Sequence, residues 1–155
     1  MTSTTRPSTL DDVSRAIVEQ LQIDGRKSYS DIGRAVELSE AAVRQRVQKL
    51  IESGVMQIVA VTDPVQMGFA RQAMIGIRTS GDARIVADEL AKIPAVEYVV
   101  LTAGSFDIMV EVVCTDDADL LELLNGIIRR VPGVLETEVF TYLQLKKQQY
   151  NWGTL

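Results

Sequence analysis

The chain has 155 residues, of which 46% are hydrophobic, so it carries enough apolar side chains for folded cores and is not globally disordered. Its formal net charge is −5, and residues 63–155 account for all of it, because residues 1–62 hold eight Lys or Arg and eight Asp or Glu. The chain contains no histidine and only one cysteine, which argues against a zinc or haem site, so we predict no metal and no cofactor.

The first residues, MTSTTRPST, contain one arginine and no apolar stretch of the kind found in secretory signals. No apolar run in the chain approaches the ~20 residues that a membrane-spanning helix needs. The lone Cys114 lies in an apolar run and has no partner for an internal disulfide, which fits a reducing compartment. We therefore predict a cytoplasmic protein with no membrane partner, and a disordered tail over residues 1–8.

Residues 9–38 predict two short amphipathic helices. Thr9-x-x-Asp12 resembles a capping box that opens the first helix, and Gly25 follows its end. Ser28-x-x-Asp31 opens the second helix in the same way. Apolar residues at helical spacing predict the inward faces: Leu10, Val13, Ile17 and Leu21 in the first helix, and Ile32, Ala35 and Val36 in the second.

The next stretch, SEAAVRQRVQKLIESG, predicts a third helix that begins after a Ser39 cap and ends before Gly54. Its apolar stripe repeats at helical spacing and consists of Val43, Val47, Leu50 and Ile51. Three short helices, with a tight turn between the last two, are the pattern of a helix-turn-helix domain.

The outward surface of the third helix resembles a surface that reads DNA, with small residues and an amide near its start and cations along its sides. We predict contacts to double-stranded DNA from nine residues: Ser28, Tyr29, Ser39, Ala41, Ala42, Arg44, Gln45, Arg46 and Lys49. The solvated face of an ordinary packing helix would look similar. In the alternative interpretations, Tyr29 packs at a helix end and Arg46 forms a structural ion pair. The net charge of zero over residues 1–62 counts against DNA binding, because DNA-binding domains usually carry an excess of positive charge.

Residues 55–62, VMQIVAVT, are rich in β-branched side chains and predict a strand that links the two halves. The second half repeats one phrase, KIPAV at residues 92–96 and RVPGV at residues 130–134. Each copy follows a helical pattern and precedes a strand, and strands are also predicted over residues 73–78 and 106–113. The order β-α-β-β-α-β is the ferredoxin-like split motif, with Gly104-Ser105 in its central hairpin.

The later helix of this half is predicted to begin at a Thr115 cap, with Leu120, Leu124 and Ile127 facing inward. One face of the sheet is predicted to carry Ala73, Ile75, Ile77, Ile108, Val110, Val112, Leu135, Val139 and Leu143. The opposite face still carries apolar side chains, namely Met74, Val99, Leu101, Met109, Val113, Phe140 and Tyr142. Because two helices cover only one face of such a sheet, a second subunit is predicted to cover the other.

Four stretches in this order resemble the Lrp/AsnC (feast/famine) transcriptional regulators: LDDVSRAIVEQLQIDGR, LSEAAVRQRVQKLIESGV, DPVQMG and GSFD. The resemblance covers nearly the whole chain. It implies an α+β fold, in which an N-terminal winged-type helix-turn-helix (residues 9–54) is joined by a strand linker (residues 55–68) to a ferredoxin-like βαββαβ ligand-sensing domain (residues 69–145), with a C-terminal tail after it (residues 146–155). It also implies homodimers that often assemble into octamers, and a small amino-acid-like effector.

The resemblance places effector recognition at the central hairpin, between dimers. The family's Gly-x-aromatic-Asp motif matches Gly104, Phe106 and Asp107, although many relatives carry Tyr where this chain has Phe106. Asp107 would pair with a ligand ammonium, and backbone N–H groups near Gly104 would receive a carboxylate. In the alternative interpretation, both residues serve only the turn. The predicted effector site is completed by Leu101 and Thr102 and, from another subunit, Thr137 and Thr141.

The sequence therefore predicts a DNA-binding transcriptional regulator, tuned by an amino acid or related metabolite, and not an enzyme. Siroheme decarboxylases resemble this family in layout, but the chemistry attributed to them uses histidines, which this chain lacks. The other alternative is a metabolite-sensing interaction module without specific DNA binding. The zero net charge of residues 1–62 leaves this alternative open.

Overall fold

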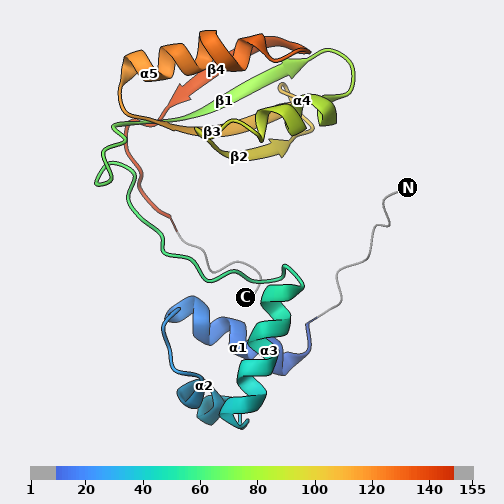
Figure 1. The fold of residues 1–155 in the computed structure, drawn as a ribbon, viewed down its shortest axis with the longest axis vertical. Helices are drawn as coiled ribbons and strands as arrows, with labels where there is room; N and C mark the ends of the chain where they lie inside the picture. The colour runs from blue at the N-terminus through green and yellow to red at the C-terminus, as the bar shows by residue number, and fades with distance from the viewer. Residues whose placement is uncertain (1–9, 149–155) are drawn as a thin grey trace. The chain divides into compact units, whose positions relative to one another are not determined.

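A computed structural model describes residues 10–148, which fold as two compact units (Figure 1). The first unit contains the described residues up to Ala60, and the second spans Val61–Lys146. Within residues 10–148 no helix is long and apolar enough to cross a membrane. The prediction of a disordered tail over residues 1–8 and most of the predicted C-terminal tail lie outside the described residues.

The first unit contains three helices, α1 (Asp12–Ile23), α2 (Tyr29–Ala35) and α3 (Glu40–Glu52). As predicted, Ser28 caps α2, Ser39 caps α3, and Gly54 follows α3 in the left-handed region with φ of 71°. The predicted start of α1 is corrected: its cap is Asp11, whose carboxylate accepts a hydrogen bond from the Ser14 N–H at 2.7 Å. Thr9, the other half of the predicted capping box, lies outside the described residues.

The core of the first unit forms where the predicted apolar stripes meet. Its buried members are Ile17, Leu21, Ile32, Val43 and Val47. Two predicted inward residues are exposed instead. Ile51 is 43% exposed, because it lies about 100° around the helix from the buried Leu50. Ala35 is exposed at the last turn of the seven-residue α2, where the helix ends before another element covers it.

The predicted strand over residues 55–62 does not form, and no wing accompanies the three helices within the described residues of the first unit. A strand needs a neighbour to which its N–H and C=O groups bond, and a single chain supplies none here. Four β-branched side chains of this segment are therefore left exposed: Val55, Ile58, Val59 and Val61.

The second unit confirms the predicted βαββαβ fold (Figure 1). Its four antiparallel strands pair in the order β2-β3-β1-β4. In chain order its elements are β1 (Arg71–Thr79), α4 (Ala83–Leu90), β2 (Val96–Leu101), β3 (Ile108–Cys114), α5 (Asp117–Glu122), the π-helical turn η1 (Leu123–Ile127), the 3₁₀ turn η2 (Ile128–Arg130) and β4 (Val134–Thr141).

The later helix differs from its prediction at both ends. Its cap is Asp116, which accepts a hydrogen bond from the Asp119 N–H at 2.9 Å, and not Thr115. Leu123 and Ile128 are buried in place of Leu124 and Ile127. The wider π turn between them increases the spacing of the two inward residues from three positions to five, which a uniform helical period does not anticipate.

The helix-covered face of the sheet is built as predicted at its centre, and α4 packs there in one cluster with Leu123 and Ile128. Six central residues on this face are buried: Ala73, Ile75, Ile77, Ile108, Val110 and Val112. Leu143 is 96% exposed, since it lies beyond the end of β4. Leu135 is also exposed, because a register shift pairs Thr79 with Val134 and Arg78 with Glu136 and leaves Leu135 between them.

The predicted composition of the other face, here called the open face, also changes. Val99 pairs with Val110 and Leu101 pairs with Ile108, so both lie on the helix-covered side. Five predicted residues stay on the open face: Met74, Met109, Val113, Phe140 and Tyr142. Among them, Met74, Met109 and Phe140 form an apolar strip. Within this chain no helix covers that strip among the described residues.

Candidate DNA-binding surface and effector site

The solvent side of α3 presents Ala41, Gln45 and Lys49, one turn apart from each other. Their spacing follows from the buried stripe on the opposite side, which fixes the rotation of the helix. Within the described part of the chain, no hydrogen bond or ion pair involves the side chain of Gln45 or of Lys49. An amide and a cation on one exposed helix face are free to meet base edges and phosphates.

Arg44 flanks this surface and is held in place by two neighbours. Its guanidinium lies 5.1 Å from the centre of the Tyr29 ring, and its Nη2 donates to Glu40 Oε1 at 2.8 Å. Tyr29 itself packs against the core of the unit. Tyr29 therefore packs at the start of α2, as one interpretation of the sequence held, and also supports a predicted DNA-contacting cation.

Arg46 adopts the structural alternative considered above. Its Nη1 donates to Asp11 Oδ2 at 2.7 Å and to Ser14 Oγ at 3.0 Å, which ties α3 to the start of α1. The hydrogen bond from Arg46, followed by those from the Ser14 backbone and hydroxyl, lowers the pKa of Asp11 from 3.8 to about 2. In this arrangement Arg46 orients α3, and a phosphate would have to displace Asp11 to reach it.

The Asp11 contacts predict a pH dependence of stability. Because the pKa of Asp11 is lower in the folded protein, its contribution is complete above about pH 4 and is lost as the pH falls through about 2. We expect Asp11→Asn, which keeps a capping oxygen, to lower the melting temperature at pH 6. The difference from the unmodified protein should shrink steadily between pH 4 and pH 2. A difference that stays constant over this range in circular dichroism melts would contradict the ion pair.

Ser28 and Ser39 act as helix caps. Ser28 Oγ accepts from the Asp31 N–H at 3.1 Å, and Ser39 Oγ accepts from the Ala42 N–H at 3.2 Å. Each cap fixes where a helix of the motif begins, so both residues shape the surface. Sequence reasoning missed Gly33, which is buried in α2 where a Cβ would lie 2.5 Å from the Leu38 carbonyl oxygen. A glycine inside a predicted helix, three residues before the turn at Val36, was the available signal.

The hairpin over residues 102–107 is closed by its own hydrogen bonds. Thr102 donates from its N–H to the Asp107 carbonyl at 2.9 Å and from its hydroxyl to the Phe106 carbonyl at 2.6 Å. Asp107 Oδ2 accepts from the Thr79 N–H at 2.7 Å and from the Thr79 hydroxyl at 3.2 Å. Thr102 therefore closes the hairpin, and Asp107 fixes it against the end of β1. Asp107 presents one further carboxylate oxygen beyond these bonds.

The Phe106 ring turns onto the open face and lies directly over Gly76, where a Cβ would meet ring carbons at 2.6–2.7 Å. It contacts Phe140 edge to face, with ring centres 6.1 Å apart, and the Arg78 guanidinium lies 5.8 Å from its centre. Arg78 also donates to the Ser105 carbonyl at 3.0 Å. The sequence singled out Phe106 and missed Gly76 and Arg78, which hold the ring and the hairpin.

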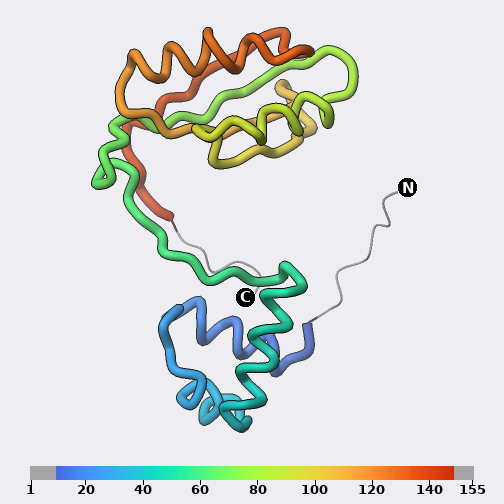
Figure 2. Tube along the Cα trace, viewed as in Figure 1, coloured from blue at the N-terminus to red at the C-terminus, as the bar shows by residue number. Residues whose placement is uncertain are grey.

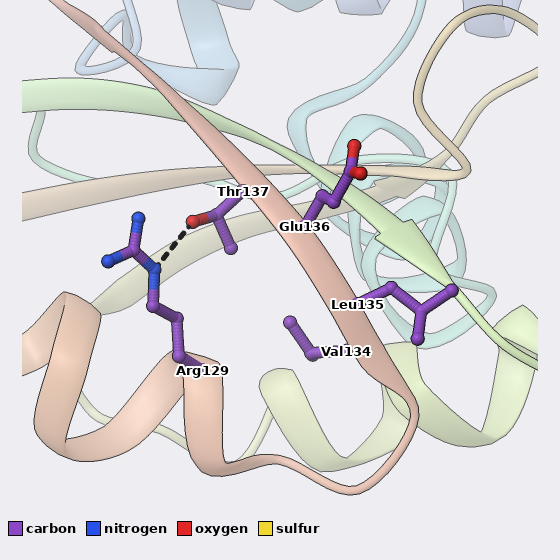
Figure 3. Close-up of a pocket in the computed structure, with 5 residues that line it drawn as sticks. All are labelled: Arg129, Val134, Leu135, Glu136 and Thr137. Carbon is purple, nitrogen blue, oxygen red and sulfur yellow. Dashed lines mark hydrogen bonds between the residues drawn. The ribbon is translucent and has the colours of Figure 1, made fainter.

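A cavity of about 440 Å³ lies beside the first residues of β4 (Figure 3). It is lined by Arg129, Val134, Leu135, Glu136 and Thr137. Arg129 Nε donates to Thr137 Oγ1 at 2.8 Å, and its Nη1 donates to Asn125 Oδ1 at 2.6 Å. The cavity thus places the Arg129 guanidinium beside apolar carbon, whereas the Glu136 carboxylate points away from Arg129 and pairs with Arg78 at 3.2 Å. Of the predicted effector residues, Thr137 lines the cavity.

The remaining predicted effector residues are distributed along the sheet. Leu101 ends β2 next to the hairpin, and Gly104 lies in the hairpin with space around it for a ligand. Thr141 pairs with Ala73 at the end of the sheet away from the hairpin, about 13 Å along β4 from Thr137 at the usual rise of a strand. A single chain therefore brings Gly104, Phe106 and Asp107 together but leaves Thr141 apart from them.

Within residues 10–148 no cluster of three or more Cys, Asp or Glu is arranged to hold a metal ion. Cys114 is buried, and burial raises the pKa of its thiol, which disfavours the reactive thiolate.

Two family models match the chain. Residues 10–51 match a model described as an AsnC-type helix-turn-helix domain, and residues 69–155 match one described as a C-terminal dimeric alpha+beta barrel domain. An uncharacterized HTH-type transcriptional regulator from Pyrococcus abyssi is 35% identical over 146 residues, which is 93% of this chain and 90% of that protein.

Solved structures give the same result for the fold. The leucine response regulatory protein LrpA from Mycobacterium tuberculosis matches with a TM-score of 0.81 and 28% identity, over 90% of this chain and 96% of that one. A transcriptional regulator from Neisseria meningitidis, solved as an L-Met complex, matches with a TM-score of 0.81 over 94% of this chain and 97% of that one. Its 23% identity shows a shared fold alone.

Proposed function

The chain belongs to the Lrp/AsnC family of helix-turn-helix transcriptional regulators, and from that premise we propose that it binds specific double-stranded DNA as a homo-oligomer controlled by an amino acid or related small metabolite. The observation that carries the proposal is the solvent face of α3. This face offers Gln45 and Lys49 without a partner in the described chain, on a helix whose rotation is fixed by Val43 and Val47.

In the proposed complex, the α3 helices of a dimer enter successive major grooves about 34 Å apart. Gln45 contacts base edges, and Ala41 and Ala42 let the start of the helix approach closely. Lys49 and Arg44 neutralise phosphates at the sides of the groove. Ser28 and Ser39 contribute by capping the two helices of the motif.

The proposed dimer forms through the open face of the second unit. Met74, Met109 and Phe140 form an apolar strip there that no helix within residues 10–148 covers, and a second copy would remove the strip from water. The match to a domain described as dimeric supports this arrangement. Assembly of such dimers into an octamer is the finer proposal, which the mass of the protein in solution tests directly.

The proposed effector site is the hairpin with Gly104, Phe106 and Asp107, completed between dimers by Leu101, Thr102, Thr137 and Thr141. Asp107 has one carboxylate oxygen beyond its bonds to Thr79, which suits a ligand ammonium. The Arg129 guanidinium beside Thr137 suits a carboxylate. Methionine is the first amino acid to test, since the structurally similar Neisseria regulator was solved with it.

We expect Gln45→Ala and Lys49→Ala to weaken DNA binding in different ways. With DNA from upstream of the protein's own gene, Gln45→Ala should reduce the preference for that DNA over random sequence. Lys49→Ala should weaken binding to both and reduce the slope of log K against log salt by about one per phosphate contact. Fluorescence anisotropy at several salt concentrations measures both effects, and Lys92→Ala, in the second unit, is the matched control. Equal behaviour of Lys49→Ala and Lys92→Ala would refute the assignment of the surface.

The same titration with and without amino acids tests the effector. A shift in affinity with one amino acid, lost in Asp107→Asn, is the expected result. If no amino acid changes the affinity for DNA, the DNA-binding proposal stands and the hairpin is only a structural turn. An absence of binding above random DNA at low salt would favour the second candidate, an interaction module, which the zero net charge of residues 1–62 keeps open.

A further inference from the structure

All three arginines of α2 and α3 are paired with carboxylates. Arg34 pairs with Asp31 within α2, Arg44 pairs with Glu40 at 2.8 Å within α3, and Arg46 reaches Asp11 at 2.7 Å. These pairs occupy three of the eight cations within residues 1–62, a segment that has no net charge. Among the three, Arg44 lies at the surface that is proposed to meet DNA, and Glu40 partly neutralises its charge there.

The pairs are exposed, which makes them exchangeable. Between 35% and 78% of each participating side chain is accessible to solvent. An ion pair at that exposure contributes little to stability. The Arg34 and Arg44 pairs therefore need not hold the fold together, whereas the Arg46 pair also links α3 to the start of α1. A DNA phosphate offers the same guanidinium the same kind of partner as the carboxylate does.

Glu40 occupies the most informative position. It is the first residue of α3, on the turn that approaches DNA in the proposed complex, and it holds Arg44 while Tyr29 supports the guanidinium from one side. A phosphate that binds Arg44 must displace Glu40 and then lie next to its negative charge. Both effects oppose binding to DNA of any sequence.

We infer that Glu40 and Asp31, together with Asp11, are affinity-determining residues that compete with DNA phosphates for Arg44, Arg34 and Arg46. The inference rests on the proposed function. Non-specific binding depends almost wholly on phosphate contacts. Partly neutralised arginines therefore hold that binding down and leave selection of a site to base contacts from Gln45.

The test uses the full chain, a random-sequence duplex of about three helical turns and fluorescence anisotropy over a range of salt. Glu40→Gln and Asp31→Asn each remove one negative charge and keep the side-chain shape. Glu52→Gln is the matched control, because it makes the same charge change on the same helix but at its last residue, where Glu52 accepts from Gln48 at 2.7 Å. Asp11→Asn is left out of this test, since Asp11 also caps α1.

We expect Glu40→Gln to bind the random duplex about 1.5- to 5-fold more tightly at low salt, the range set by one surface ion pair. The salt slope should steepen by about one per arginine released, and Asp31→Asn should act in the same direction. Glu52→Gln should remain close to the unmodified protein. Circular dichroism melts check that all variants are folded.

Glu40→Gln and Glu52→Gln with equal affinity and equal salt slope would overturn the inference while leaving the proposed function in place. Failure of the unmodified protein and of every variant to bind any duplex at low salt would overturn both. Binding by Glu40→Gln where the unmodified protein does not bind would support the inference in its strongest form.

Discussion

Gly33→Ala should destabilise the helix-turn-helix unit and abolish its binding to DNA. The new Cβ would lie 2.5 Å from the carbonyl oxygen of Leu38, and that oxygen belongs to the backbone, so no side-chain rotation relieves the contact. The turn between α2 and α3, which can be followed in Figure 2, would have to open, and with it the hydrogen bond of 2.9 Å from the Leu38 N–H to the Gly33 carbonyl.

The expected size follows from two opposing effects. Alanine gains about 1 kcal/mol of helix propensity over glycine. Forcing a methyl group into a filled, rigid site costs typically about 1–3 kcal/mol and occasionally more, and here the site is bounded by backbone. We expect a net fall in the free energy of unfolding, measured by urea denaturation of the full chain.

Gly25→Ala is the control for Gly33→Ala. Its Cβ would lie 3.7 Å from the nearest atom, the Leu21 carbonyl oxygen, which is an ordinary contact distance. This variant should melt close to the unmodified protein and keep its DNA binding. A Gly33→Ala protein as stable as Gly25→Ala would show that the turn is not closed around Gly33.

Gly76→Ala should destabilise the second unit by about 1–3 kcal/mol, the usual cost of overpacking. The added Cβ would overlap the Phe106 ring, with three ring carbons at 2.6–2.7 Å. The ring is also held by its edge-to-face contact with Phe140 and by Arg78, so moving it disturbs the hairpin over residues 102–107. Thermal melts followed by circular dichroism measure the loss.

A double-mutant cycle separates this clash from a general intolerance of side chains at the position. In a Phe106→Ala background the ring is gone, and Gly76→Ala should then cost much less than it does in the unmodified protein. The same cost in both backgrounds would show that the ring is not the obstacle. The cycle also tests whether the open face is built around Phe106, as the contacts indicate.

The helices, their order and the βαββαβ arrangement follow from local patterns that the chain repeats clearly. Ser28 and Ser39 mark helix starts by their own hydroxyls, and Gly54 marks an end through its positive φ. Patterns of this kind depend only on residues that are close together in the sequence, so they can be recognised without the tertiary structure. Two of the errors lie where a uniform period breaks, at the π turn of residues 123–127 and at the register shift beside Leu135.

The candidate sites divide in the same way. The sequence alone determined the outward face of α3, with Ala41, Gln45 and Lys49, because helical spacing and a buried stripe are enough to fix it. Only the tertiary structure decided the partner of Arg46, since Asp11 lies 35 residues earlier in the chain. It also decided that Gly76 makes room for Phe106, because packing between strands brings them together and no local spacing records it.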